Sequence, residues 1–370
     1  MKSTFLLFAF IGLFCRQSFS REIQKPSPKS GIEIQLDFES AKAITALLTK
    51  PKTTDAELDR IAKLYGSQQL IKKVSGYDKT ANETVFKQTL REITESGTVK
   101  GNDPFDWKAV KSQLSGIRQL INQLETKATF VEDVKNRILP YSPPNINGKV
   151  RACFLVGGGS LGFTLGNEDT FNVALQKIGD DYEGLVNLVA HELYHSVQQI
   201  GERNRQLEKS AAEPPKPVSN AYFLLANLWS EGTANLVGEF VKSKNPKEFS
   251  RQQQDDYARN GERARQNFAL FESLLFSAFH DPAADMGELY NIAFTTAFDE
   301  TSYYTGYRMA KVIEQYRGKE VLAGLINQDP IEFCRLYVAI YKQNPDKNLI
   351  RFSSSTEAIL AKLDEWKGKL

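Results

Sequence analysis

The stretch from Tyr182 to Ile200 constrains the fold more than any other part of the chain, because its polar and apolar residues fall on opposite sides of a helix. At about 100° per residue, six apolar side chains form one broad stripe. These are Val186, Val189, Ala190, Leu193, Val197 and Ile200. Nearly opposite lie Asn187, His191, His195 and Gln198. Such a helix packs its apolar stripe against a core and turns the two histidines away from it.

His191 and His195 are two of only three histidines in 370 residues, and Glu192 lies beside the first. Residues four apart on a helix share a face, so both imidazoles can point at one metal ion. A catalytic zinc site takes three protein ligands and leaves a fourth position for water. The two histidines therefore need one further ligand.

Glu231 is the best placed third ligand. The only other imidazole is His280, and position 201, where some zinc peptidases carry a third histidine, is a glycine. Glu231 lies early on a second expected helix, with Asn235 one turn later on the same face. Because a zinc-bound histidine commonly donates its other N–H to a nearby polar group, we expect Asn235 to orient one of the histidines. The alternative for both residues is an ordinary solvated position on a helix. The pattern predicts one Zn²⁺ ion between the two helices.

The chain begins with the features of a cleaved signal peptide. An apolar run ends at Cys15, and Ser18 and Ser20 supply the small residues that a signal peptidase reads. The run is about a dozen residues, short of the roughly 20 that a membrane helix needs. Acylation of Cys15 is the alternative, but the bulky Phe14 before it disfavours a lipoprotein anchor. We expect residues 1–20 to be removed and the protein to act in the periplasm or outside the cell.

The charge balance argues against a nucleic-acid partner. Loss of residues 1–20 removes Lys2 and Arg16 and no acid, so the formal charge falls from +2 to 0. Binding to a polyanion normally needs a basic excess. The remaining cysteines, Cys153 and Cys334, can pair in an exported protein or stay as two buried thiols, and their spacing fits no zinc finger.

The pattern divides the mature chain into an N-terminal helical region, residues 21–145, and a second region, residues 146–370. In the first, Thr54 and Glu57 form a capping-box signature ahead of apolar residues at helical spacing. The proline-rich segment PYSPPNING, residues 140–148, marks the boundary.

Two strand-like runs, residues 149–158 and 169–178, open the second region. The glycine-rich loop between them lacks the Lys-Ser or Lys-Thr of a P-loop, and no helix opens directly after it, so we expect no phosphate site. From Asp181 the pattern is almost wholly helical, apart from a polar insert at residues 201–220. The predicted fold class is α+β, mainly α-helical, with a small sheet.

The segment HELYH, followed by WSEGTA, resembles the gluzincin group of zinc metallopeptidases, in which two histidines on one helix and a glutamate on the next bind the metal. Ser230 stands where asparagine is frequent in that group. Across most of the mature chain, the order of features also resembles a largely uncharacterised family of exported bacterial zinc-dependent peptidases. These features are LDFESAKAITALL, FLVGGGSLGF, the histidine segment and YYTGYRMAKVIEQYRGKE. The resemblance implies a zincin-like catalytic core in residues 146–370, with His191, His195 and Glu231 as ligands and Glu192 as general base.

The chemistry expected of such a site is hydrolysis of a peptide bond in a peptide or protein substrate. Zinc lowers the pKa of bound water to about 7, and Glu192 can take its proton and pass it to the leaving amine. Charge on the carbonyl oxygen needs a further donor. The main candidates are Tyr303 and Tyr304, followed by Tyr307 and His280.

Two further expectations concern the walls of the site. Gly306 indicates that its segment approaches another helix or the metal cleft closely. Residues 169–178 are expected to be the edge strand to which an extended substrate adds.

Three other functions are compatible with the same residues. One is a non-catalytic zinc-binding or peptide-binding protein on the same scaffold, although a purely structural site has no use for Glu192 as a base. A second is a zinc hydrolase of a non-peptide amide or a cell-wall linkage. The third, a helical interaction module with a coincidental motif, requires that no metal binds.

Overall fold

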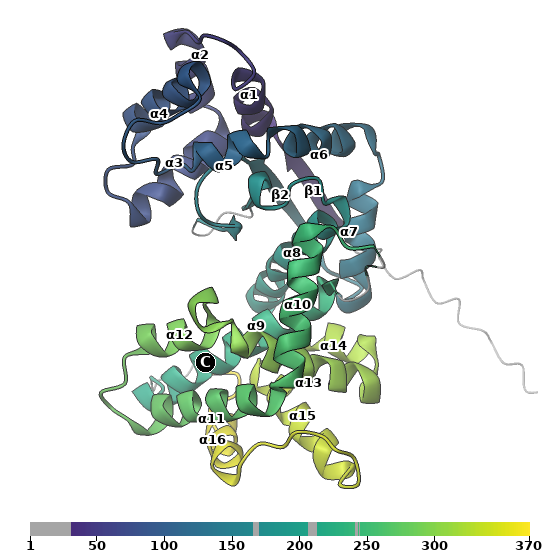
Figure 1. Ribbon diagram of the computed structural model, residues 1–370. Coiled ribbons are helices and arrows are strands. Elements are labelled where there is room, and N and C mark those ends of the chain that lie inside the picture. Colours follow the sequence, from purple (N-terminus) through teal and green to yellow (C-terminus); the bar gives the residue numbers. More distant parts are fainter. Residues whose placement is uncertain (1–30, 166–169, 206–212, 241–242, 244) are drawn as a thin grey trace, which may run out of the picture.

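The computed structural model describes residues 31–165, 170–205, 213–240, 243 and 245–370. The expected signal peptide, residues 1–20, and Cys15 lie outside the described residues. Figure 1 shows two parts, a sheet surrounded by helices above and a bundle of helices below, with helix α8 (Tyr182–Asn204) between them. The fold is α+β and mainly helical, as the sequence predicts.

The upper part contains all four strands of the described chain. They are β1 (Gly31–Asp37), β2 (Asn147–Leu155), β3 (Gly162–Phe163) and β4 (Thr170–Ala174). Its helices are α1 (Glu39–Leu47), α2 (Asp55–Ala62), α3 (Tyr65–Tyr77), α4 (Glu83–Ser96), α5 (Trp107–Ser112), α6 (Leu114–Thr126) and α7 (Phe130–Ile138), with the 3-10 turns η1 (Leu139–Tyr141) and η2 (Leu175–Lys177).

The described residues of the lower part form helices and the loops that connect them. Its helices are α9 (Lys216–Val237), α10 (Glu248–Glu262), α11 (Ala264–His280), α12 (Met286–Phe294), α13 (Thr301–Arg317), α14 (Lys319–Leu325), α15 (Ile331–Gln343) and α16 (Ser354–Asp364), with the 3-10 turn η4 (Thr296–Phe298). Helix α9 contacts α8, α11, α13, α15 and α16, and it is therefore the centre of the bundle.

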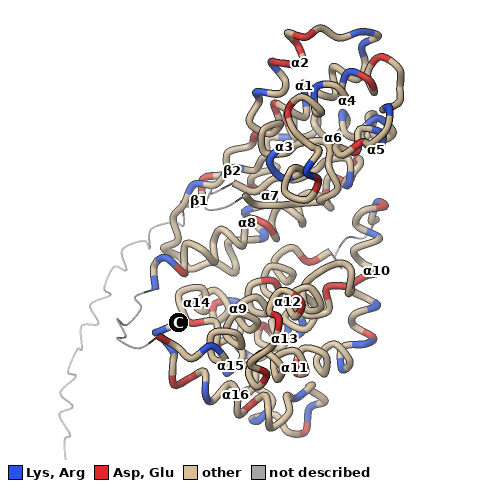
Figure 2. Tube along the Cα trace, turned by 90° about the vertical axis from the view of Figure 1, so that its left-hand side faces the viewer, with Lys and Arg blue, Asp and Glu red and all other residues tan. Residues whose placement is uncertain are grey.

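The sheet has the strand order β1-β2-β4-β3. The pairs β1–β2 and β2–β4 are parallel, and β3 is antiparallel to β4. Helices α1 and α3 contact β2 from above, and α8 contacts β2 and β4 from below (Figure 1 and Figure 2). The sheet therefore supports α8 from the side opposite the helical bundle.

Strand β1 connects the two regions expected from the sequence. It belongs to the N-terminal region, yet Gly31 pairs with Asn147, 116 residues later. Residues on both sides of the expected 145/146 boundary therefore share one sheet and one continuous hydrophobic core. The alternation of Ile32, Ile34 and Leu36 with polar residues was the available signal for this strand.

Local sequence signals account for several of the helices. The Thr54–Glu57 capping box is confirmed: the Thr54 hydroxyl accepts from Glu57 N at 3.2 Å, and the Glu57 carboxylate accepts from Thr54 N at 3.2 Å. Helix α5 begins with the fully buried Trp107, whose indole N–H donates to Thr89 Oγ1 at 2.9 Å. The two strand-like runs of the second region are also confirmed as β2 and β4.

Cys153 and Cys334 are both buried and free, so the alternative of two buried thiols holds in this structure. Burial raises the pKa of each thiol above its ordinary value, with Asp37 adding to the effect at Cys153. None of the helices in the described part of the chain has the length and apolarity needed to cross a membrane.

Candidate metal centre

Helix α8 carries the histidines between the two parts of the molecule. Its N-cap, Asp181, accepts hydrogen bonds from Gly184 N at 2.8 Å and Ser250 N at 2.9 Å, which fixes the start of the helix. All six residues of its apolar stripe are at most 8% exposed. On the opposite face, the Nε2 atoms of His191 and His195 lie 3.2 Å apart. The amphipathic arrangement expected from the sequence is confirmed.

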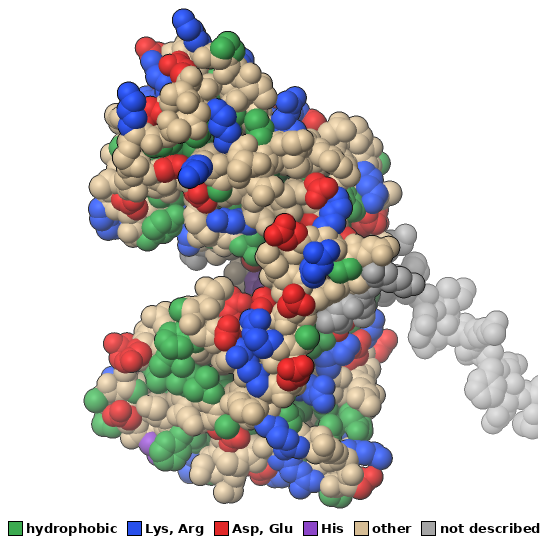
Figure 3. All heavy atoms as spheres, viewed as in Figure 1, with side chains coloured by type: hydrophobic (Ala, Val, Ile, Leu, Met, Phe, Trp, Pro, Cys, Tyr) green, Lys and Arg blue, Asp and Glu red, His purple; other side chains and the backbone are tan. Residues whose placement is uncertain are grey.

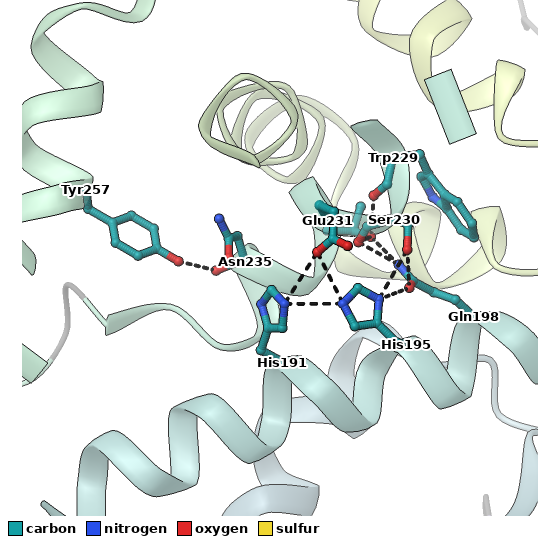
Figure 4. Close-up of polar contacts among 9 residues, drawn as sticks. His191, His195, Gln198, Trp229, Ser230, Glu231, Asn235 and Tyr257 are labelled. Atoms are coloured by element: carbon teal, nitrogen blue, oxygen red, sulfur yellow. Dashed lines mark hydrogen bonds and ion pairs between the residues drawn. The ribbon is translucent and has the colours of Figure 1, made fainter. Parts of the chain in front are cut away.

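Glu231 reaches the two imidazoles from helix α9. Its Oε2 lies 3.5 Å from His191 Nε2 and 3.3 Å from His195 Nε2 (Figure 4). One nitrogen from each histidine and one carboxylate oxygen all lie within 4.8 Å of one another. Two helices that are separated in sequence thus bring two nitrogens and one oxygen to a single point.

The donor set fits a zinc ion. Two imidazole nitrogens and one carboxylate oxygen are a ligand combination used in catalytic zinc sites. Glu231 Oε2 is buried, and apart from the two imidazoles no group of the described chain reaches it, although buried carboxylate oxygens are normally hydrogen-bonded. A cation between the three residues would supply the missing interaction.

Opposite charges dominate the electrostatics of the three residues. Burial by itself lowers the pKa of His195, but the Glu231 carboxylate outweighs burial and raises that pKa to about 9. Burial likewise favours the neutral form of Glu231, and the two imidazoles overcome it and hold the pKa of Glu231 well below its ordinary value. The cluster therefore keeps Glu231 ionised and ready to bind a cation.

His195 is oriented by Gln198 and Ser230. Its Nδ1 lies 2.9 Å from Gln198 Oε1 and 3.1 Å from Ser230 Oγ. The Gln198 amide group in turn donates to Ser230 O at 2.9 Å and to Thr233 Oγ1 at 2.8 Å. An Nδ1–H donated to Gln198 leaves Nε2 of His195 as the metal-binding nitrogen. Gln198 lies three residues after His195 on the polar face of α8, and that spacing was the available sequence signal.

Asn235 does not make the contact that its spacing suggested. Its backbone carbonyl accepts from Tyr257 Oη at 2.8 Å. Among the described residues, no hydrogen bond joins its side chain to either imidazole, and Figure 4 shows it on the His191 side of the cluster. The expectation that Asn235 orients a histidine is therefore corrected. The hydrogen bonds that orient His195 come from Gln198 on α8 and from Ser230, the residue before Glu231.

The cleft that contains the cluster lies between the two parts of the molecule, where Figure 3 shows the surface hollowed. His191, Glu192, His195 and Glu231 all line it. Glu192 is next to strand β3: a Cβ atom added at Gly162 would lie 3.0 Å from Glu192 Oε1. The Glu192 carboxylate thus occupies the wall of the cleft formed by the sheet.

The edge strand of this wall is β3. Residues 169–178 were expected to form that edge, which is wrong, because β4 is buried along its length between β2 and β3. The glycine-rich loop folds back over β4, with Ala174 N donating to Leu161 O at 2.9 Å. Gly157 and Gly158 make this turn with φ of 109° and 73°, which favour glycine.

The tyrosines of α13 divide between the cleft and the core. Tyr303 lines the cleft, and its ring is parallel to that of His191, with an interplanar angle of 2° and centroids 6.3 Å apart. Tyr304 is 8% exposed and packs edge-on against Tyr257. It does not line the cleft, and the expectation that Tyr304 is a catalytic residue is therefore corrected. Consecutive residues on a helix differ by about 100°, and only one of the two can face the histidines.

The remaining candidates also lie outside the cleft lining. Tyr307 donates to Glu239, and His280 packs against Phe276 at the end of α11. Tyr290, which no sequence pattern singled out, lines the cleft from α12. Burial, followed by the charge of Glu231, raises the pKa of Tyr290.

Two glycines allow α9 and α13 to touch backbone to backbone. A Cβ at Gly232 would lie 2.3 Å from the carbonyl carbon of Gly306, and a Cβ at Gly306 would lie 2.2 Å from Leu228 O. The close approach expected at Gly306 is confirmed, and its partner is a helix. This crossing holds Glu231 and Tyr303 on neighbouring helices beside the histidines.

A comparison with known families identifies the family of the chain. One family model matches residues 58–346, which include all three candidate ligands and Glu192. The chain belongs to the family described as "Putative zinc dependent peptidase (DUF5700)". This membership confirms the resemblance to the uncharacterised family of zinc-dependent peptidases. No curated protein and no solved structure matches the chain.

Proposed function

We propose that the protein is a single-zinc peptidase of the gluzincin type, with His191, His195 and Glu231 as its metal ligands and a zincin-like core. The observation that carries the proposal is the convergence of the three ligand atoms within 4.8 Å on a cleft. A bound Zn²⁺ would act as a Lewis acid toward water and the scissile carbonyl group.

Glu192 is the proposed general base. It follows the first histidine, so it is displaced by about 100° around the helix from His191 and lies beside the three converging atoms. Its carboxylate accepts a proton from the attacking water and delivers that proton to the nitrogen of the leaving amine. Its position against Gly162 keeps the carboxylate in the cleft.

Tyr303 and Tyr290 are the proposed hydrogen-bond donors to the carbonyl oxygen of the substrate. Both line the cleft with the candidate ligands. Burial, and after it the charge of Glu231, raises the pKa of both phenols, so both keep their O–H at neutral pH. A phenol that stays protonated can donate to an oxygen on which negative charge develops.

Strand β3 is the proposed docking edge for an extended peptide. It is the edge strand on the side of the cleft, and Gly162, Phe163 and Thr164 line the cleft beside Glu192. A peptide can add to such an edge through main-chain hydrogen bonds. The signal-peptide features of residues 1–20 support action in the periplasm or outside the cell.

Metal analysis of the purified protein tests the proposal. We expect about one equivalent of zinc in the wild-type protein and its loss from His191→Ala, because two remaining ligands hold zinc poorly. Equal and negligible zinc in both proteins would overturn the proposal.

The Glu192→Gln variant tests the chemistry separately from the metal. We expect it to keep its zinc and to lose turnover of a peptide library by roughly 10²-fold to 10⁴-fold, the usual contribution of a general base. Turnover at the wild-type rate would remove Glu192 from this role.

A further inference from the structure

The cleft continues past the metal ligands to the C-terminal end of α8. Its lining there includes Gln199, Glu202 and Arg205, together with Tyr222 at the start of α9 and Pro330. Arg205 is the only lysine or arginine among the described residues that line this cleft. The metal ligands and one cationic side chain thus belong to one cavity.

Among the described residues, the Arg205 guanidinium group is only partly satisfied. Its side chain is only 11% exposed, and its Nε is buried without a hydrogen-bond partner in this part of the chain. The carboxylate paired with it among the described residues, that of Glu202, lies 4.0 Å from Nη2 and is 69% exposed. An ion pair this long and this exposed contributes little. A buried charged donor without an acceptor is costly, so an acceptor that enters the cleft gains an unusually favourable interaction.

The surroundings of Arg205 add a second donor. Burial raises the pKa of Tyr222 to about 12, with Asp329 adding to the rise, and the charge of Arg205 and its hydrogen bond to Tyr222 opposing it. The Tyr222 hydroxyl therefore stays protonated, and it lines the cleft with Arg205. A planar guanidinium group beside a hydroxyl matches the geometry of a carboxylate, which accepts two hydrogen bonds side by side.

We propose that Arg205 is a specificity residue that binds a carboxylate group of the substrate at this end of the cleft. The inference rests on the proposed peptidase function. Arg205 follows His195 by ten residues, or about 15 Å of helix, which an extended peptide spans with about four residues. The carboxylate is either the C-terminus of a peptide or the side chain of an aspartate or glutamate about four residues from the cleaved bond.

Paired peptide libraries test the proposal on the zinc-loaded full-length protein. One library of acetylated decapeptides ends in a free carboxylate, a second ends in a carboxamide, and a third has the carboxamide and one internal glutamate. Mass spectrometry gives the cleavage sites and kcat/KM for each. We expect the wild-type protein to prefer one carboxylate-bearing library by at least about tenfold, the effect of one hydrogen bond to a charged group. Preference for the first library identifies a C-terminal carboxylate, and preference for the third identifies an acidic side chain.

Two variants and a control assign the preference to Arg205. Arg205→Gln should abolish it, Arg205→Lys should retain part of it, and Arg351→Gln, which removes one exposed positive charge elsewhere, should leave it unchanged. No preference in the wild-type protein, or an equal preference in Arg205→Gln, would overturn the proposal. If Arg205→Gln fails to fold, Arg205→Lys tests the proposal in its place, because lysine keeps the charge and loses the planar pair of donors. A preference equal to that of the wild-type protein would then overturn the proposal.

A binding measurement separates failure of this inference from failure of the proposed function. In the Glu192→Gln background, calorimetry compares the carboxylate and carboxamide peptides with and without Arg205→Gln. If the wild-type protein cleaves none of the libraries, the proposed function fails, and this measurement decides the inference alone. At least tenfold weaker binding after loss of Arg205 supports it, and equal affinities overturn it.

Discussion

Helices α8 and α9 supply the three candidate ligands in different ways. Helix α8 carries two of them within one turn, so their mutual position follows from helical geometry. Helix α9 supplies Glu231, whose position depends on packing against α8 on one side and α13 on the other. The local sequence of α8 thus sets the positions of the two histidines, whereas the packing of α9 against other helices in the tertiary structure sets the position of Glu231.

The largest expected effect comes from widening that crossing. Gly306→Val places side-chain atoms where even a Cβ would lie 2.2 Å from Leu228 O. We expect a loss of about 3 kcal/mol or more in the free energy of unfolding, or a shifted α9 with impaired zinc binding, because the obstacle is backbone and cannot move aside. Chemical denaturation and zinc titration measure the two outcomes.

Gly324→Ala is the matched control for this prediction. Gly324 lies in α14 with nothing within 4 Å of the added Cβ. We expect this change to be neutral or to stabilise the protein by about 0.5–1 kcal/mol. Wild-type stability and zinc affinity in Gly306→Val would show that the site does not depend on the α9–α13 crossing.

The next effect concerns the face of α13 beside the histidines. Tyr303→Phe should lower kcat by about 10²-fold if its hydroxyl stabilises the developing oxyanion, with zinc content unchanged. Tyr304→Phe should leave kcat within a few fold, because Tyr304 packs in the core against Tyr257. Peptide hydrolysis at saturating substrate measures kcat for both variants. Equal losses of kcat would show that a position in the cleft does not give Tyr303 a catalytic role.

Removal of the group that orients His195 should have a smaller effect, and on metal binding. We expect Gln198→Ala to weaken zinc affinity by about 10-fold to 100-fold, because the imidazole loses the hydrogen bond at Nδ1. Asn235→Ala removes a comparable amide from α9 and should change the affinity by less than about threefold. A stronger effect at Asn235 than at Gln198 would reverse the correction drawn from the hydrogen bonds.

The last expected effect, at most about tenfold for each pH unit, is the pH dependence of zinc binding to the metal-free protein. Since the pKa of His195 is raised to about 9, a proton must leave this imidazole before zinc can bind below that pH. The apparent zinc affinity should therefore rise with pH by up to about tenfold per unit between pH 7 and 9 and then level off.

Chelator competition at pH 7, 8 and 9 measures this slope. Glu231→Gln serves as the control, because it removes the largest effect that raises the pKa of His195 and leaves only Glu192 and Gln198 to oppose burial, so the slope over this range should decrease. A flat profile in the wild-type protein would contradict the coupling of the histidine to Glu231.

The features that the sequence predicted are those set by neighbouring residues. The Thr54–Glu57 capping box and the two faces of α8 depend on spacings of three or four positions, and the structure has both. Tyr303 and Tyr304 could not be separated in the same way, because the face of α13 that meets the cleft is fixed by its contact with α9. The spacing of residues likewise did not identify the hydrogen-bond partners of His195. They are Gln198 on α8 and Ser230 on α9, and Asn235 is not among them.

The sheet was the least predictable part, since its pairings are long-range. The edge was assigned to residues 169–178 because nothing in the two residues of β3 distinguishes them from a loop. Strand β1 alternates correctly, but its partner lies more than a hundred residues away, and no local pattern indicates which strand that is.

The pairing of β1 with β2 has a consequence for the order of folding. Closing a segment of 116 residues costs about 4 kcal/mol of chain entropy before any contact compensates for it. Non-local pairing of this kind slows folding. Helix α8 rests on β2 and β4, so it reaches its final position only after the sheet has assembled. Zinc uptake should therefore be among the last events of refolding, and its rate would report completion of the native state.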